Sequence, residues 1–212
     1  MTTTTKQETV RIRPPNLRTA KFEIIGTTPL LQAAFSEKAT QAIRAKHEAG
    51  STAKGKKVRE ARDFSADCAG AAHRATEGWY GVPAAAFRCA LISACRLVDF
   101  KMTLAKLSIF VLQDGFDKVS GQPLVKLKVG KPEETVMAVR NATGVVDLRA
   151  RPMWREWGIS LRVRFDADQF TLDDVTNLLA RVGEQVGIGE GRHDSRESAG
   201  MGYGCFAIEG AD

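Results

Sequence analysis

The chain has 212 residues, 43% of them hydrophobic and 26% charged, a composition typical of a globular protein with a buried core. Lys and Arg outnumber Asp and Glu by 31 to 25, so the formal net charge of +6 at pH 7 favours an anionic partner. No apolar run approaches the about 18 residues of a membrane span. Residues 1–5 lack the apolar segment of an export signal. We therefore expect a cytoplasmic protein that does not contact a membrane.

The cysteines favour neither a disulfide framework nor a metal site. Cys68, Cys89, Cys95 and Cys205 form no Cys-x-x-Cys pair. We expect reduced, mostly buried thiols. The spacing from Cys68 to His73 and from Cys89 to Cys95 matches no standard zinc pattern, so no metal or cofactor is expected.

Residues 1–19 are polar, include Pro14 and Pro15, and predict a flexible N-terminal arm. Residues 20–212 are expected to form a single domain. Its first strand is predicted at residues 20–25, where alternation places Phe22 and Ile24 on one face.

Residues 36–80 are rich in Ala, Lys, Arg and Gly and predict an insertion after the first strand. Residues 36–49 are compatible with a helix. A flexible basic loop follows, with Lys54, Lys56 and Lys57. Mobile basic loops bind phosphate backbones, whereas many charged runs are only solvated surface, and both interpretations remain open.

Pro83 favours the start of a helix, because its missing N–H would be unpaired there. Apolar residues then recur at helical spacing from Phe87 to Val98. The apolar run 107–112 predicts a central strand, and residues 124–129 predict another. Residues 136–139 and 144–148 predict a hairpin-type insertion before the last helix.

Residues 157–165 alternate, which predicts a half-buried strand with Ile159, Leu161, Val163 and Phe165 inward and arginines outward. Trp154 and Trp157 lie among these arginines. The tryptophans either pack in the core or stack on bases, as aromatic residues beside arginines do in proteins that bind single strands.

Residues 166–183 predict the last helix. Thr171 is its expected N-cap, with Asp174 completing a capping box, and Gly183 is its expected end. The element order is strand, insertion, helix, strands, helix, loop, strand. It indicates the α+β class and the βαββαβ order of the ferredoxin-like fold.

The stretch 187–204 contains six glycines: Gly187, Gly189, Gly191, Gly200, Gly202 and Gly204. Such a cluster predicts positive φ angles or the close approach of a ligand to the backbone. The glycines follow a helix and precede a strand, the reverse of a dinucleotide-binding site, and no Gly-Lys-Ser/Thr follows. With Arg192 and Arg196 beside it, the loop either cradles an anion or is a surface turn.

This loop resembles the C-terminal glycine-rich loop of the RAMP superfamily, the RNA-binding proteins of CRISPR systems. Residues 81–91 are similar to the family's Pro-led entry to its first helix, although Ala84, Ala85 and Ala86 stand where the family often has Gly-Ser-Ser. The resemblance covers residues 21–208 in order of elements. It implies a ferredoxin-like (RRM-like) core and self-association into a helical or ring oligomer.

The partner implied by the resemblance is single-stranded RNA, with single-stranded DNA open. The residues expected at the nucleic acid are Lys54, Lys56, Lys57, Arg88, Gly189, Gly191, Arg192, Arg196, Gly200, Gly202 and Gly204.

Some members of the family are ribonucleases that use a histidine as general acid or base. His193 is the candidate for that role here, with Tyr203 or Ser195 assisting. We expect a non-catalytic binding protein. The alternatives are a metal-independent endoribonuclease and a structural assembly protein of a virus or mobile element.

Overall fold

The computed structural model describes residues 12–35, 40–41, 43–45, 62–140, 144–195 and 200–210. The chain is a mixed α+β protein with antiparallel sheets, which confirms the predicted class. No helix in the described ranges is both long enough and apolar enough to cross a membrane.

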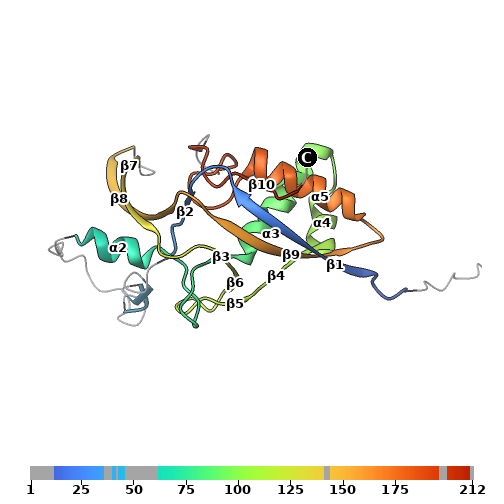
Figure 1. Cartoon of the computed structure of the whole chain (residues 1–212), viewed down its shortest axis with the longest axis horizontal. Coiled ribbons are helices and arrows are strands. Elements are labelled where there is room, and N and C mark those ends of the chain that lie inside the picture. Colours follow the sequence, from blue (N-terminus) through green and yellow to red (C-terminus); the bar gives the residue numbers. More distant parts are fainter. Residues whose placement is uncertain are drawn as a thin grey trace, which may run out of the picture.

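The largest sheet joins strands that lie far apart in the sequence. It contains β1 (Leu17–Gly26), β4 (Ile109–Leu112), β9 (Gly158–Asp166) and β10 (Phe206–Ile208), in the order β10-β1-β9-β4, and all neighbours are antiparallel. Figure 1 shows β1 and β9 crossing the molecule side by side. Because β1 begins at Leu17, residues 17–19, expected in the arm, pair with β9 instead.

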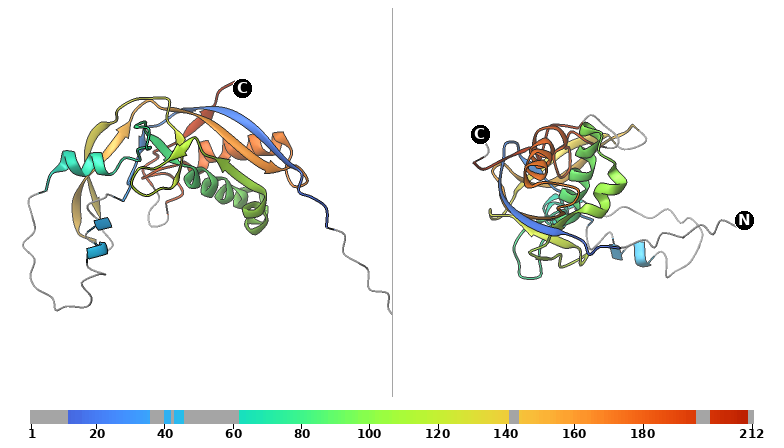
Figure 2. Two further views of the ribbon diagram at one scale, coloured as in Figure 1. Left: turned by 90° about the horizontal axis from the view of Figure 1, so that it is seen from below. Right: turned by 90° about the vertical axis from the view of Figure 1, so that its right-hand side faces the viewer.

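One face of this sheet is covered by helices. These are α3 (Ala84–Ala94), the 3-10 helix η1 (Cys95–Val98), α4 (Met102–Ser108), α5 (Leu172–Arg181) and the π-helical turn η2 (Val182–Val186). The left view of Figure 2 shows the helices on one side of the arch made by β1 and β9. The buried inner residues of β9 are the four predicted from alternation: Ile159, Leu161, Val163 and Phe165.

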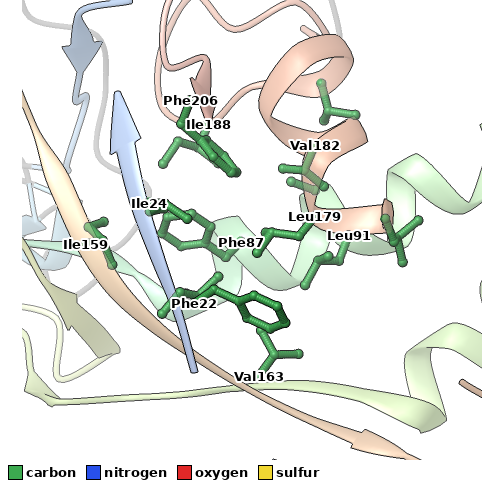
Figure 3. Close-up of a cluster of buried hydrophobic side chains, with 14 of the residues drawn as sticks. Phe22, Ile24, Phe87, Leu91, Ile159, Val163, Leu179, Val182, Ile188 and Phe206 are labelled. Atoms are coloured by element: carbon green, nitrogen blue, oxygen red, sulfur yellow. The ribbon is translucent and has the colours of Figure 1, made fainter. Parts of the chain in front are cut away.

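The core forms where the helices meet the sheet (Figure 3). Phe87 and Leu91 of α3 and Leu179 of α5 lie against Ile24 of β1 and Phe206 of β10, and all are fully or almost fully buried. Burying a side chain of this size contributes about 1.5–3 kcal/mol relative to leaving it exposed.

Both ends of α5 bear on the predictions. Thr171 and Asp174 form the expected capping box. The prediction that Gly183 ends the helix is wrong, because the chain continues through η2 and turns at Gly187, where φ is +71°. A Cβ built at Gly183 would overlap the carbonyl oxygen of Phe206, so this glycine allows the helix to pack closely on β10.

The strand predicted at residues 107–112 is present as β4, but its first two predicted residues and its central place in the sheet are wrong. Leu107 belongs to α4 and is 75% exposed, and the strand begins at Ile109. This strand, β4, is the edge of the sheet in the described order. A short apolar run is equally compatible with the end of a helix and with a strand, so its pattern alone did not decide.

Two small sheets complete the described fold. One has β2 (Leu30–Leu31), β8 (Val146–Trp154) and β7 (Glu133–Arg140), and α2 (Phe64–Gly70) packs on its hairpin. The other has β3 (Gly81–Pro83), β6 (Pro123–Lys126) and β5 (Gly115–Phe116). The predicted hairpin is therefore confirmed, and Figure 1 shows that β7 and β8 extend away from α3 and α5.

Trp154 and Trp157 are core residues. They are each 3% exposed, and their ring N–H groups donate to the carbonyl oxygens of Gly130 (2.9 Å) and Thr28 (2.7 Å). A ring buried and bonded in this way cannot stack on a base, so the core interpretation of both tryptophans is confirmed.

Candidate nucleic-acid interface

The glycine-rich loop connects η2 to β10, and its six glycines all have φ between +71° and +78°. This confirms the expectation of positive φ. Other L-residues reach this region only at a cost of about 1–2 kcal/mol.

Most of these glycines pack against the chain's own backbone. A Cβ built at Gly204 would overlap the carbonyl oxygen of Ile188, and a Cβ at Gly200 would overlap that of Arg192. A Cβ at Gly189 would overlap the carbonyl oxygen of Leu31. At Gly202, by contrast, the nearest atom is His193 Cε1 at 3.5 Å, an ordinary contact. Gly202 is therefore the position of this group where the backbone remains open.

Backbone hydrogen bonds hold the loop in this folded-back shape. The N–H of Met201 donates to the carbonyl of Gly191 (2.7 Å), and that of Ile188 donates to the carbonyl of Gly204 (3.0 Å). The N–H of Glu190 donates to the carbonyl of Leu31 (3.0 Å), which fixes the loop to β2. The described part of the loop, residues 187–195 and 200–204, is thus packed into the fold.

The two described carboxylates in the middle of the loop are engaged by arginines. Glu190 accepts two hydrogen bonds from Arg151 of β8, and these side chains are only 21% and 15% exposed. Asp194 accepts from Ser93 of α3 and from Arg96 (2.9 Å). The bond from Ser93, followed by that from Arg96, lowers the pKa of Asp194. The negative charge of each carboxylate is therefore largely balanced by an arginine.

A groove of about 640 Å³ lies between the loop, the start of α3 and the segment after β2. This volume is within the range of about 300–1,000 Å³ that is usual for small-molecule sites. Its lining residues are mainly apolar, with a few polar groups: Leu30, Gln32, Ala33, His73, Val82, Pro83, Ala86, Cys89, Ala90, Ile92, Ser93, Met102, Lys106, Val186, Ile188, Gly189, Glu190, Arg192 and Asp194.

Positive charge reaches this groove from three directions. Arg192 enters from the loop and donates to the carbonyl of Gly189 (3.1 Å), while Lys106 enters from α4. The third source is the start of α3, where Pro83 precedes the helix without a capping side chain. Uncapped N–H groups and the helix dipole favour an anion at such a position.

A histidine that sequence reasoning had left unassigned lines the same groove. His73 is 13% exposed, and its Nδ1 lies 3.1 Å from Oδ2 of Asp117, which is 6% exposed. Asp117 also accepts from the backbone N–H and the hydroxyl of Ser120 (2.8 and 3.0 Å). Burial lowers the pKa of His73, and the bond to Asp117 only partly offsets this effect.

The structure brings only part of the predicted site together. Gly189 and Arg192 line the groove, and Gly191, Gly200, Gly202 and Gly204 lie elsewhere in the same loop. Four predicted residues lie outside the described ranges: Lys54, Lys56, Lys57 and Arg196.

Arg88 has a different role from the one expected. Its guanidinium donates to the carbonyls of Ile109 (3.0 Å) and Lys106, and lies 5.4 Å from the ring centre of Phe110. It therefore joins α3 to the end of α4 and the start of β4, and it does not line the groove.

The candidate catalytic histidine, His193, is exposed and lies in a second, smaller hollow of about 380 Å³ beside Arg96 and Gln185. No hydrogen bond to its ring is made by any residue that the structure describes. General acid–base chemistry requires a positioned group, and no described residue orients the His193 ring as Asp117 orients the ring of His73.

Across the described ranges, no group of three or more His, Cys, Asp or Glu side chains is arranged to hold a metal ion. Three of the cysteines are buried, Cys89 is exposed, and none is in a disulfide. No family model matches the chain, and no curated protein matches it.

Proposed function

We propose that this chain binds single-stranded nucleic acid, most simply RNA, in the groove between the glycine-rich loop and the start of α3. The proposal includes a ferredoxin-like core of the RAMP kind. Its support is the strand order β10-β1-β9-β4, in which α3 connects β1 to β4 and α5 connects β9 to β10. This order and these two helical connections support a βαββαβ core.

The observation that carries the proposal is the charge around the groove. Arg192, Lys106 and the uncapped start of α3 all lie at its lining, while Glu190 and Asp194 are engaged by arginines. The phosphates of an extended nucleic-acid strand would balance the positive charge that remains around the groove. Phosphates bound at helix starts and by arginine are common in proteins.

A salt titration of binding tests this proposal. Fluorescence anisotropy with labelled single-stranded RNA and DNA gives the slope of log affinity against log salt. Replacing Arg192 and Lys106 together by Gln should weaken binding and make the slope shallower by about 0.7 for each phosphate that is no longer neutralised.

The matched control is the double change of Arg155 and Lys118 to Gln. It removes the same charge from two exposed positions that do not line the groove. Equal weakening in the two double variants would mean that only net charge matters. A wild-type protein that binds neither RNA nor DNA at low salt would refute the proposal.

Self-association is the second part of the proposal, and the β7–β8 hairpin supports it. Its side chains alternate between half-buried and exposed along much of both strands. Among the exposed side chains are Val136, Val146 and Leu148, which are 51%, 55% and 49% exposed. An apolar cluster on a projecting hairpin is typical of a protein–protein contact.

Sedimentation velocity with and without bound RNA tests this second part. Val146→Ser with Leu148→Ser should abolish assembly without unfolding the hairpin, because both side chains are half exposed. Val119→Ser, at a position 51% exposed in another part of the fold, is the control. A wild-type protein that stays monomeric on RNA would refute self-association and leave RNA binding standing.

A further inference from the structure

The groove is more apolar than a site for phosphates alone requires. Its accessible lining includes five apolar residues that are half-buried or exposed: Ala33, Pro83, Ala86, Cys89 and Met102. Phosphate oxygens are strongly hydrated and gain nothing from such a surface. Sites that hold a nucleobase, in contrast, combine apolar walls with a few polar groups that bond the edge of the base.

His73 supplies a polar group of this kind. Nδ1 of His73 lies 3.1 Å from the carboxylate of Asp117, which is an acceptor only, and 3.2 Å from the side-chain nitrogen of Gln122. We assign the proton to Nδ1, because an unprotonated Nδ1 would face the carboxylate, and Nε2 is then the acceptor of the neutral ring. No described residue makes a hydrogen bond to Nε2. Every fully buried side-chain nitrogen or oxygen in the described ranges has a hydrogen-bond partner, so Nε2 is not fully buried. Nε2 is therefore reached by solvent, and His73 lines the groove.

We propose that this groove is a nucleobase subsite: one base of the bound strand lies against its apolar wall, and His73 Nε2 accepts a hydrogen bond from an N–H on the edge of that base. The inference rests on the proposed function and adds a base contact to the phosphate contacts of Arg192 and Lys106. Asp117 acts as a positioning residue, because it holds the ring and its tautomer.

Strands without bases test the subsite directly. Anisotropy titrations should compare an RNA oligonucleotide of uniform sequence with an abasic strand of the same length and sugar. The abasic strand should bind at least about fivefold more weakly, since one stacked base contributes about 1–3 kcal/mol. The salt slopes of the two strands should agree, because their phosphates are the same.

A groove-filling variant locates the effect. Ala33 is exposed and lines the groove, so Ala33→Trp should block the subsite without disturbing the core. It should weaken binding of the base-bearing strand towards the affinity of the abasic strand. Ala207→Trp, at an exposed position on β10 outside the groove, should leave the difference unchanged.

His73→Gln should reduce the same difference, with its melting temperature measured alongside. If that variant unfolds, Ala33→Trp still decides. Equal affinity for the two strands, or a difference that survives Ala33→Trp, would overturn the subsite and leave phosphate binding intact. Failure to bind either strand would overturn the proposed function and the subsite with it.

Discussion

Two glycines of the same loop, Gly204 and Gly202, allow the packing role of the loop to be separated from its binding role. Both have positive φ, +71° and +75°. A Cβ at Gly204 would overlap the carbonyl oxygen of Ile188 and lie 2.8 Å from its carbonyl carbon. A Cβ at Gly202 would meet nothing closer than 3.5 Å. Both substitutions to Ala place a side chain at positive φ, and only the one at Gly204 adds a steric clash with Ile188.

The free-energy difference follows from these distances. The positive φ costs about 1–2 kcal/mol at each position. At Gly204 the backbone of Ile188 must also move, although Ile188 is 1% exposed and donates its N–H to the carbonyl of Gly204 at 3.0 Å. Breaking that hydrogen bond and disturbing the packing of Ile188 adds about 2 kcal/mol or more. Gly204→Ala should thus cost at least about 3 kcal/mol of unfolding free energy, and Gly202→Ala about 1–2 kcal/mol.

Thermal unfolding followed by circular dichroism measures the difference. For a chain of this size 1 kcal/mol shifts Tm by about 2–4 °C, so Gly204→Ala should lower Tm by about 6 °C or more and Gly202→Ala by clearly less. Gly202→Val should then remain folded at 25 °C. Gly202 lies outside the groove, so this variant should bind RNA more weakly than the wild type if the strand continues from the groove over the open backbone at Gly202. Equal destabilisation by the two Ala substitutions would refute the packing argument. Undiminished RNA binding by folded Gly202→Val would remove Gly202 from the interface.

Three further outcomes are expected. Burial holds the pKa of His73 below its usual 6.5, so at mildly acidic pH the unfolded chain binds more protons than the folded chain. The free energy of unfolding should therefore fall as the pH drops below about 6.5. Urea titrations at several pH values should show this dependence for the wild type and its loss in His73→Gln. Thr171→Ala removes one half of the capping box of α5 and should cost about 1 kcal/mol of unfolding free energy, whereas Thr176→Ala on the same helix is the control. Labelled RNA incubated with the protein should show no cleavage that depends on His193, because no described residue orients the His193 ring. Cleavage by the wild type that disappears in His193→Ala would favour the ribonuclease alternative.

Elements defined by local pattern could be predicted from the sequence. The alternation of residues 158–166 determined which face of β9 is buried, and Thr171 with Asp174 determined the start of α5. Elements that depend on distant neighbours could not. Gly183 stops a helix in isolation, but here it allows contact with Phe206, more than twenty residues away. Similarly, Leu107 is compatible with a strand until the end of α4 is known.

The same division applies to the site. The positive φ of the loop glycines follows from their density, which is a local signal. What the glycines contact is not local, because Gly189 meets Leu31 from the other end of the chain. His73 and Asp117 are 44 residues apart and meet because Ala75 pairs with Asp117 in an isolated bridge. The segment around His73 has no clear apolar period, so no sequence signal brings this pair together.

The packed state of the loop bears on how a groove with few charges would bind a flexible polymer. A loop of free glycines would lose much backbone entropy on binding, and that cost would offset the favourable interactions with the strand. Here the glycines are already fixed by backbone packing against Ile188, Arg192 and Leu31, and the Arg151–Glu190 pair holds the loop against β8. The groove wall is therefore preorganised before any strand arrives. A variant that loosens the loop, such as Glu190→Ala, should therefore weaken RNA binding. Charge alone predicts the opposite, because removing the carboxylate of Glu190 would favour the binding of an anionic strand. Tighter binding by Glu190→Ala would mean that charge, and not preorganisation, dominates at this site.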